Sequence, residues 1–280
     1  NPFGWVVQGL RNRVDVVHIQ WWSLPLAPVF LTIVLLARLR SIPVVVTAHN
    51  VRPHEASPWF RRVSRLLYWL ADQVLVHSEN NRDQLRADYP EIASRVTHVS
   101  MGPLGLGVLR PGRNTAREKL GLSPDAPTLL FFGTIRPYKG LADLIRAFTR
   151  LREAHPNAVL LIAGKPWEAW EPYQALIDAG DIGERVRLHL DYIPEVDVAD
   201  FFVAADLVVL PYTHFDAQSA VGVQALGFET PLLVMRTGGL PDLVGGDSGW
   251  IVSPGNVDEL AASIHAFLEN VAEGRRCFQT

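Results

Sequence analysis

Two cationic side chains follow the most apolar segment of the chain. Residues 129–132 are uninterrupted apolar residues, typical of a buried parallel strand, and Gly133 then allows a sharp turn. Arg136 and Lys139 lie in the next few residues, before a helical pattern that begins at about Leu141. An open α/β sheet binds ligands beside the carboxyl ends of its strands, and a helix amino terminus favours an anion. The spacing therefore predicts an anion site, with a diphosphate as the obvious ligand, although a solvated arginine and lysine in a surface loop is the alternative.

The elements that must position these cations alternate between strand and helix, which is typical of parallel α/β architecture. Before a segment rich in Gly and Pro at 101–114, which we interpret as an interdomain hinge, strands are predicted at 14–19, 43–48, 74–76 and 95–99. After it, strands are predicted at 128–132, 158–163, 185–190, 207–210, 231–235 and 250–252. Helices are predicted between them, at 141–153, 171–179, 197–203, 217–227 and 240–244, and then at 256–270. We therefore expect a parallel sheet of about six strands, with Gly133 at the carboxyl end of one of them.

Composition excludes several classes of protein. With 280 residues, 48% of them hydrophobic and 20% charged, the chain can bury two ordinary cores and is not disordered. A net charge of −3 argues against general nucleic-acid binding. Cys277 is the only cysteine, so no internal disulfide can form, which fits a reducing, cytoplasmic compartment. The sequence has neither an Asp-x-Asp pattern nor a cluster of His and carboxylates at metal-ligand spacing, so we expect no metal cofactor.

One apolar run raises the question of a membrane. Residues 24–37 are too few and too interrupted by proline for a confident span, so we expect a buried helix. Trp21 and Trp22 before the run, with Arg38 and Arg40 after it, leave a peripheral membrane role open.

Several ordered landmarks resemble one enzyme family. They are DVVHIQW at 15–21, PVVVTAHN at 43–50, ADQVLVHSENNRDQL at 71–85, GTIRPYKG at 133–140, ADLVVLPY at 205–212, a helix at 216–227, TP at 230–231, GGLPD at 238–242 and GWIVSPGNVDELA at 249–261. In this order and spacing, they resemble the retaining glycosyltransferases of family 4, which have the GT-B fold. The resemblance covers nearly the whole chain.

The resemblance implies two Rossmann-like domains with the active site in the cleft between them. We expect a partial, acceptor-side domain at 1–108 and a nucleotide-sugar-binding domain at 109–280. Family members usually have another strand and a glycine-rich loop before the segment that matches 15–21, and a further helix after the last one here. The resemblance therefore suggests a chain truncated at both ends, and leaves open whether it is active alone.

The resemblance also assigns roles to the two cations and to the start of a helix. Lys139 matches the diphosphate-binding lysine of the family. Arg136 belongs to the phrase IRPYKG of one branch, whereas many relatives place their arginine at the position of Thr134. The backbone N–H groups of Ser219 and Ala220 are candidate diphosphate donors, and Ser219 is a plausible N-cap. A packing or surface role for Arg136 and an ordinary capped helix are the alternatives.

Three further positions match residues that bind the sugar or the ribose. The acidic pair of the family corresponds to Asp216, which would contact the donor sugar, and Gln224, which would bind the ribose hydroxyls without a charge. His49 matches a histidine that faces the donor sugar, although a lone histidine after a strand is often structural. We take His49 and Asp216 as the candidate catalytic residues.

The implied reaction is transfer of a sugar from a nucleotide-diphosphate sugar to a glycan, lipid-linked or small-molecule acceptor, with retention of configuration. The expected location is the cytoplasm, and the inner face of the membrane is left open as the site within it. A non-catalytic nucleotide-sugar-binding or scaffold protein is the main alternative, favoured by Gln224. A sugar epimerase of the same architecture would lack the IRPYKG and GGLPD landmarks.

Overall fold

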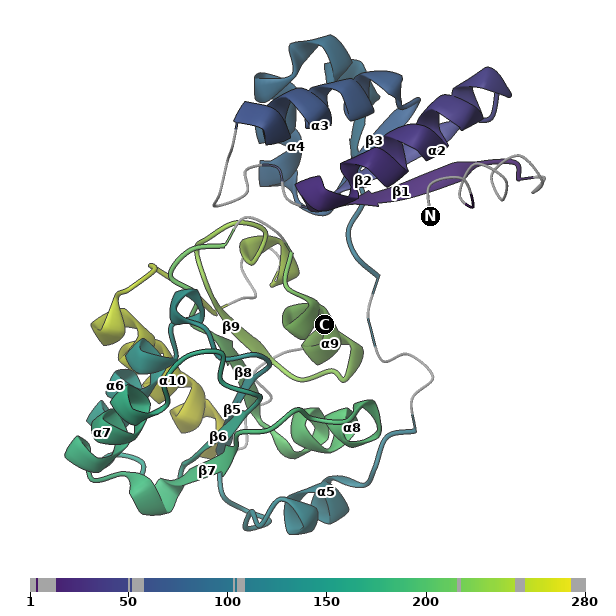
Figure 1. Cartoon of the computed structure of the whole chain (residues 1–280). Coiled ribbons are helices and arrows are strands. Elements are labelled where there is room, and N and C mark those ends of the chain that lie inside the picture. Colours follow the sequence, from purple (N-terminus) through teal and green to yellow (C-terminus); the bar gives the residue numbers. More distant parts are fainter. Residues whose placement is uncertain are drawn as a thin grey trace. The chain divides into compact units, whose positions relative to one another are not determined.

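The chain forms two compact units, each with its own parallel sheet (Figure 1). The amino-terminal unit comprises residues 1–101 and 216–218, and the carboxyl-terminal unit comprises 102–215 and 219–280, so the chain first passes from one unit to the other at the start of the predicted hinge. The computed structural model describes residues 4, 14–49, 51, 58–102, 104, 109–215, 218–244 and 250–272. Within these residues, no helix is long and apolar enough to cross a membrane.

The carboxyl-terminal unit contains the predicted six-stranded parallel sheet, in the order β10-β9-β8-β5-β6-β7. The strands are β5 (Thr128–Phe132), β6 (Val159–Ala163), β7 (Val186–His189), β8 (Leu207–Leu210), β9 (Leu232–Met235) and β10 (Trp250–Val252). Chain order reverses between β8 and β5, where an open sheet of this kind has its ligand crevice. Gly133 follows the last residue of β5, as predicted.

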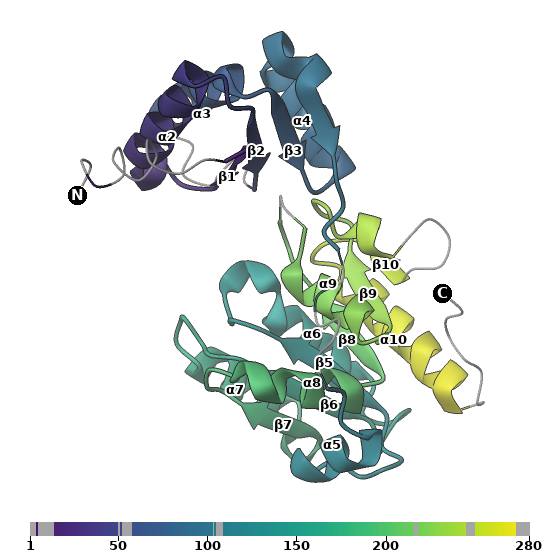
Figure 2. The ribbon, with the colours of Figure 1, turned by 90° about the vertical axis from the view of Figure 1, so that its right-hand side faces the viewer.

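Helices cover both faces of this sheet (Figures 1 and 2). One face packs on α6 (Leu141–Arg150), α7 (Glu171–Ala179) and α10 (Val257–Ala272). The other face carries α5 (Arg113–Lys119), α8 (Glu195–Ala204) and α9 (Ala220–Gly227). Side chains alternate accordingly along β5, where Phe131 belongs to the first core and Phe132 packs on Phe201 and Phe202 of α8. Burial on both faces explains why these strands are continuous apolar runs.

Two predicted helices differ in extent. The helix expected at 217–227 begins at Ala220, because the Ser219 side chain accepts a hydrogen bond from the Gly222 amide and caps it. The helix expected at 240–244 is one 3₁₀ turn, η5 (Pro241–Leu243).

The amino-terminal unit is a four-stranded parallel sheet in the order β1-β2-β3-β4. Its strands are β1 (Val17–Trp21), β2 (Val44–Ala48), β3 (Gln73–Val76) and β4 (Val96–His98), and its helices are α2 (Ala27–Leu39), α3 (Pro58–Leu70) and α4 (Glu79–Asp88), with 3₁₀ turns η1 (Leu24–Leu26) and η2 (Pro90–Arg95). Trp21 is fully buried, stacks on Phe60 of α3 and donates to the Ser64 hydroxyl over 2.9 Å. The indole of Trp21 is therefore a core group and is unavailable to a membrane.

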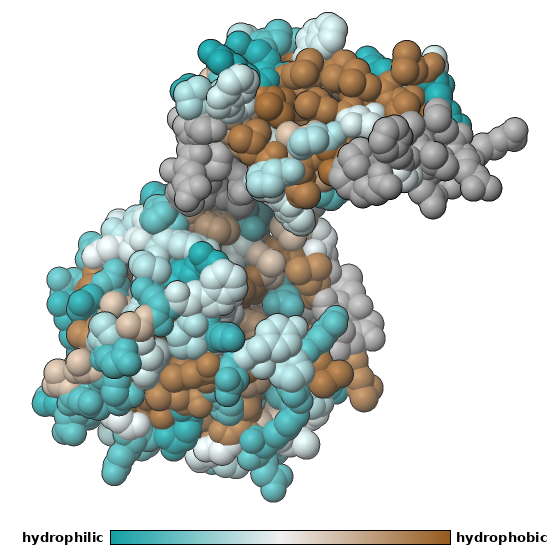
Figure 3. Space-filling view, viewed as in Figure 1, coloured by the Kyte–Doolittle hydropathy of each residue, from teal (hydrophilic) through white to brown (hydrophobic). Residues whose placement is uncertain are grey.

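Helix α2 is the predicted apolar helix, and only part of its surface is buried. Ala27, Val34 and Ala37 pack into the core, whereas Leu35 and Leu39 are exposed. Apolar side chains gather over this helix in the space-filling view (Figure 3).

Candidate functional site

Lys139 is held beside the carboxyl end of β5 by a tight turn. It ends the 3₁₀ turn η3 (Pro137–Lys139), and Gly140 follows with φ 67°, which lets α6 start at once. A Cβ on Gly140 would lie 1.9 Å from the Pro211 carbonyl oxygen, so the turn is pressed against the segment after β8. As a result the Lys139 side chain is only 8% exposed, with its ammonium nitrogen 5.5 Å from the centre of the Tyr212 ring.

The ammonium of Lys139 has no ion-pair or hydrogen-bond partner among the described residues. The structure gives its ammonium neither a carboxylate within 4 Å nor a hydrogen bond in those residues, although almost all buried charges in proteins are paired. Burial, and to a smaller extent the nearby positive charge of Arg136, lower the pKa of Lys139 to about 8. The group is still mostly protonated at neutral pH. Lys139 is therefore a buried cation that an anionic ligand would stabilise.

The first turn of α9 lies next to this cation. A Cβ on Gly133 would be 3.1 Å from the Lys139 ammonium and 3.3 Å from a methyl of Val221, so both side chains border the same glycine. The hydroxyl of Tyr212 lies 3.3 Å from the Ser219 hydroxyl at the N-cap of α9. The structure thus brings Lys139 together with the helix start that contains Ser219 and Ala220. Backbone N–H groups at such a start and a nearby ammonium are the donors that a phosphate requires.

Arg136 takes a different position from Lys139. Its guanidinium carbon lies 4.1 Å from the centre of the Trp167 ring, in a stacking contact. Trp167 is 65% exposed and lies in the bend before α7. Arg136 is half-buried, on the same carboxyl edge of the sheet as Lys139.

Gln224 lies one turn further along α9 and Asp216 falls outside the described residues. The side chain of Gln224 is half-buried and forms no hydrogen bond within the part of the chain that the structure describes. The ribose-binding role of Gln224 and the geometry of its pair with Asp216 stay predictions.

His49 follows β2 in the amino-terminal unit and lies close to the rings of a tryptophan and a second histidine. Its Nε2–H donates to the Gln20 side-chain oxygen over 2.6 Å, and its ring lies 4.9 Å from Trp22 and 5.4 Å from His77. Burial, followed by the charges of His77 and His18, lowers the pKa of His49, so the neutral ring is favoured. Since Nε2 donates, Nδ1 of the neutral ring is an acceptor for a hydroxyl.

Sequence reasoning missed two of these neighbours. Tyr212 contacts both the Lys139 ammonium and the Ser219 hydroxyl that caps α9. Its position directly after an apolar strand, in LPY, is the sequence feature that could have marked it as a site residue. His77 follows β3 as His49 follows β2, so the two neighbouring parallel strands bring both rings to one edge. Only the pairing of the strands reveals that the two rings meet.

Comparison with known proteins identifies the family of the chain. The family described as "Glycosyl transferases group 1" matches residues 112–279, and the "Glycosyl transferase 4-like domain" matches residues 3–102. A D-inositol 3-phosphate glycosyltransferase of Mycobacterium marinum (strain ATCC BAA-535 / M) is 31% identical over 278 residues, covering 93% of this chain and 57% of that protein. A glycogen synthase of Mycobacterium tuberculosis (strain ATCC 25618 / H37Rv) is 28% identical over 274 residues, covering 94% and 62%. The chain spans about three fifths of the length of these relatives.

Solved structures share the fold. Sucrose-phosphate synthase from Thermosynechococcus elongatus matches with a TM-score of 0.75 at 21% identity, over 99% of this chain and 70% of that one. Anabaena HepE in complex with UDP matches with a TM-score of 0.79 at 19% identity, over 96% and 72%. The matched family covers more than half of the chain, and both units have the parallel α/β folds expected of it. The chain therefore belongs to the group 1 glycosyl transferases, family 4, with the GT-B fold.

Proposed function

We propose that this protein transfers a sugar from a nucleotide-diphosphate sugar to an acceptor with retention of configuration. The observation that supports it best is Lys139, a buried cation with no ion pair or hydrogen bond in the described residues, beside the capped start of α9. A group that must hold and release a diphosphate needs such preorganised positive charge, which does not have to be assembled during the reaction.

In the proposed reaction, charge builds up on the diphosphate as its bond to the sugar breaks. The Lys139 ammonium and the N–H groups of Ser219 and Ala220 stabilise that charge, and Arg136 turns from Trp167 to a phosphate oxygen. The acceptor attacks from the face that the diphosphate leaves, and a phosphate oxygen receives its proton, so no covalent protein nucleophile is needed. No metal ion takes part at this step.

Gln224, Asp216 and His49 complete the proposed donor contacts. The Gln224 amide binds the ribose hydroxyls, for which it offers both a donor and an acceptor. Asp216 and His49 bind the sugar, and the favoured neutral state of His49 suits a hydrogen bond to a hydroxyl.

The nature of the donor and acceptor is part of the proposal. One solved relative was captured with UDP, and UDP-glucose was bound in another crystal of it, so uridine diphosphate is the first nucleotide to test here. Glycans, lipid-linked sugars and small alcohols are the acceptor classes. For a cytoplasmic enzyme at a membrane face, Trp22, Leu35 and Leu39 offer exposed apolar contacts, as do Trp59 and Trp69 on α3.

The test is a transfer assay with the intact protein. We expect nucleoside diphosphate release from one donor in a set of nucleotide sugars, an α-linked product from an α-linked donor by NMR, and unchanged activity with a chelator. Lys139→Met should abolish transfer, whereas Lys119→Met, which removes the same charge from an exposed site, should leave it unchanged. An inverted product would refute retention, and full activity of the Lys139 variant would refute the site.

A non-catalytic nucleotide-sugar-binding protein is the second candidate, and Gln224 in place of an acidic residue favours it. Such a protein would bind the donor by calorimetry and depend on Lys139 for binding, but would release no nucleotide with any acceptor. The same set of titrations and assays therefore separates the two candidates.

A further inference from the structure

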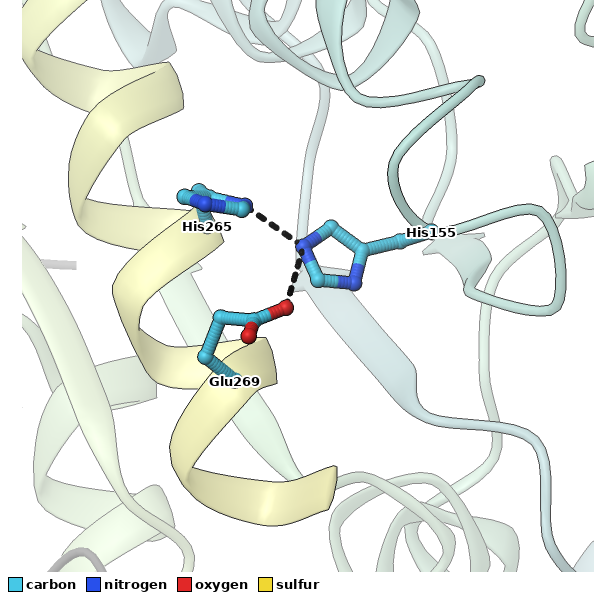
Figure 4. A group of neighbouring side chains, drawn as sticks. All are labelled: His155, His265 and Glu269. Atoms are coloured by element: carbon cyan, nitrogen blue, oxygen red, sulfur yellow. Dashed lines mark hydrogen bonds and ion pairs between the residues drawn. The ribbon is translucent and has the colours of Figure 1, made fainter. Parts of the chain in front are cut away.

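Three side chains with metal-binding atoms meet far from the site described above (Figure 4). His155 lies in the connection between α6 and β6, and His265 and Glu269 lie one turn apart on α10. Positions four apart on a helix project from the same side, so His265 and Glu269 face His155 together. This cluster was not predicted from the sequence, because 110 residues separate the two histidines.

The distances suit one small cation. Nε2 of His155 lies 2.7 Å from Nδ1 of His265 and 3.7 Å from a carboxylate oxygen of Glu269, and all three atoms are within 4.8 Å of one another. Ligands about 2.0–2.1 Å from a tetrahedral zinc ion are themselves about 3.3 Å apart. The three atoms therefore need only small side-chain rotations to surround an ion, and the imidazole–imidazole hydrogen bond would be exchanged for two metal bonds.

The backbone holds the central ligand in place. The side chain of His155 is 11% exposed, its backbone N–H donates to the Leu151 carbonyl, and its carbonyl accepts from the Ala158 amide and the Arg185 guanidinium. The partner helix α10 is fixed through core residues such as Ile264. The cluster thus joins two segments that are each anchored independently.

The groups around the cluster suit a cation. Arg185 nearby opposes an added cation, but its guanidinium lies over the Phe148 ring, and the Glu269 carboxylate supplies the compensating negative charge. Two imidazoles and one carboxylate suit zinc and similar transition metals better than magnesium or calcium.

We propose that His155, His265 and Glu269 form a divalent transition-metal site, of zinc type, with the remaining position filled by water. The site lies four residues before β6 begins, whereas Lys139 follows the end of β5. Because the strands are parallel, His155 lies at their amino-terminal ends and Lys139 at their carboxyl-terminal ends. The metal would therefore join α10 to the connection before β6 and would not touch the donor. The inference is therefore independent of the proposed transfer reaction.

The test is calorimetric titration of the chelator-treated protein with zinc chloride, together with thermal unfolding. We expect one zinc ion per chain, a higher melting temperature with zinc, and no response to magnesium. His155→Gln and His265→Gln should each weaken zinc binding at least tenfold, and Glu269→Gln about tenfold. Glu153→Gln, which removes an exposed carboxylate two residues from His155, and His98→Gln, in the other unit, should bind zinc as the wild type does.

Cobalt provides a second readout that does not depend on stability. Bound at the site, Co²⁺ should give visible absorption bands of four- or five-coordinate geometry, which zinc displaces and Glu269→Gln reduces. This variant changes an exposed side chain and should fold normally. Absence of zinc binding by the wild type, or equal binding by all three ligand variants, would overturn the proposal. Nucleotide binding should be the same in every variant, which keeps this test separate from that of the transfer reaction.

Discussion

Two buried cations at opposite ends of β5 show how differently one unit can treat a positive charge. Arg117 on α5 lies beside Thr128, where the strand begins, and Lys139 lies beside Gly133, just after the strand ends. The two residues are 2% and 8% exposed, respectively. Similar burial therefore does not imply a similar role.

Arg117 is fully satisfied by the protein. Its guanidinium donates to the carbonyls of Ala204, Ser123 and Pro124 at 2.6–3.0 Å, and to Asp206 at 2.8 Å. Asp206 also accepts from the Thr128 amide over 2.8 Å, which ties the pair to the sheet. This cation stabilises the fold.

Lys139 has none of these partners, and its lowered pKa reflects the resulting cost. Holding it charged at pH 7 costs about 3 kcal/mol, since one pKa unit corresponds to about 1.4 kcal/mol. A fold that accepts such a cost at the carboxyl edge of its sheet is typical of a binding site. We therefore propose that Arg117 is a structural charge and that Lys139 is a functional one.

The largest expected effect is the loss of Arg117. Arg117→Met should lower the free energy of unfolding by about 3–5 kcal/mol, because it leaves buried carbonyls and the Asp206 carboxylate with fewer partners. Arg113→Met is the matched control: Arg113 also pairs with Asp206, but its side chain is 42% exposed and should contribute less than about 1 kcal/mol. Urea unfolding of both variants measures this, and equal losses would remove the distinction between buried and exposed arginine.

Lys139→Met should weaken ligand binding without lowering the stability of the protein, in contrast to Arg117→Met. We expect the free energy of nucleotide-diphosphate binding to become less favourable by about 2–3 kcal/mol, the contribution of a buried charge-assisted hydrogen bond. The free energy of unfolding without ligand should stay equal or rise. Calorimetry and urea unfolding on the same samples give both numbers. A destabilised variant with normal affinity would make Lys139 a structural cation like Arg117.

Proton linkage should sharpen the comparison further. Below pH 8, Lys139 is charged in both the folded and the unfolded chain, so the cost of burying its charge is fully present. Between pH 8 and its ordinary pKa of 10.5, the folded chain loses the proton first, so the free energy of unfolding rises with pH. A bound diphosphate needs the charged form, so affinity should fall about tenfold per pH unit above 8. Calorimetry at pH 8.5 in buffers of different ionisation enthalpy should reveal proton uptake, which Lys139→Met abolishes; buffer-independent heats in the wild type would contradict the assignment.

The smallest effect is expected at Gln224. If its amide binds the ribose, Gln224→Glu should strengthen nucleotide-diphosphate binding by about 1 kcal/mol, the difference between a neutral and a charge-assisted hydrogen bond. Lys139 and Arg136 should offset repulsion between the new carboxylate and the phosphates. Titration of both proteins decides this, with Leu226→Gln, an exposed position on the same helix, as the control. Unchanged or weaker binding would show that Gln224 does not hold the ribose.

The strands and their order of succession were predictable, because their signal is local. Buried parallel strands require continuous apolar runs, so the bounds of β5, β8 and β10 agree with those predicted from the sequence. The cap of α9 was equally local, since Ser219 needs only the amide of Gly222 three residues away. The family landmarks added Lys139, Gln224 and His49 as candidates by position in the chain.

What the sequence by itself determined is thus the alternation of elements, the turn after β5 and the residue types available at each strand end. Only the tertiary structure decided which charges are paired. Arg117 and Lys139 are both cations near the same strand, but within the described part of the chain only Arg117 has a carboxylate partner, Asp206, which lies 89 residues away in the sequence. It also decided that Arg136 stacks on Trp167 and that His155 meets α10. The physical reason is that periodicity and capping depend on neighbours within a few residues, whereas burial, pairing and pKa depend on groups that chain folding brings together from far apart.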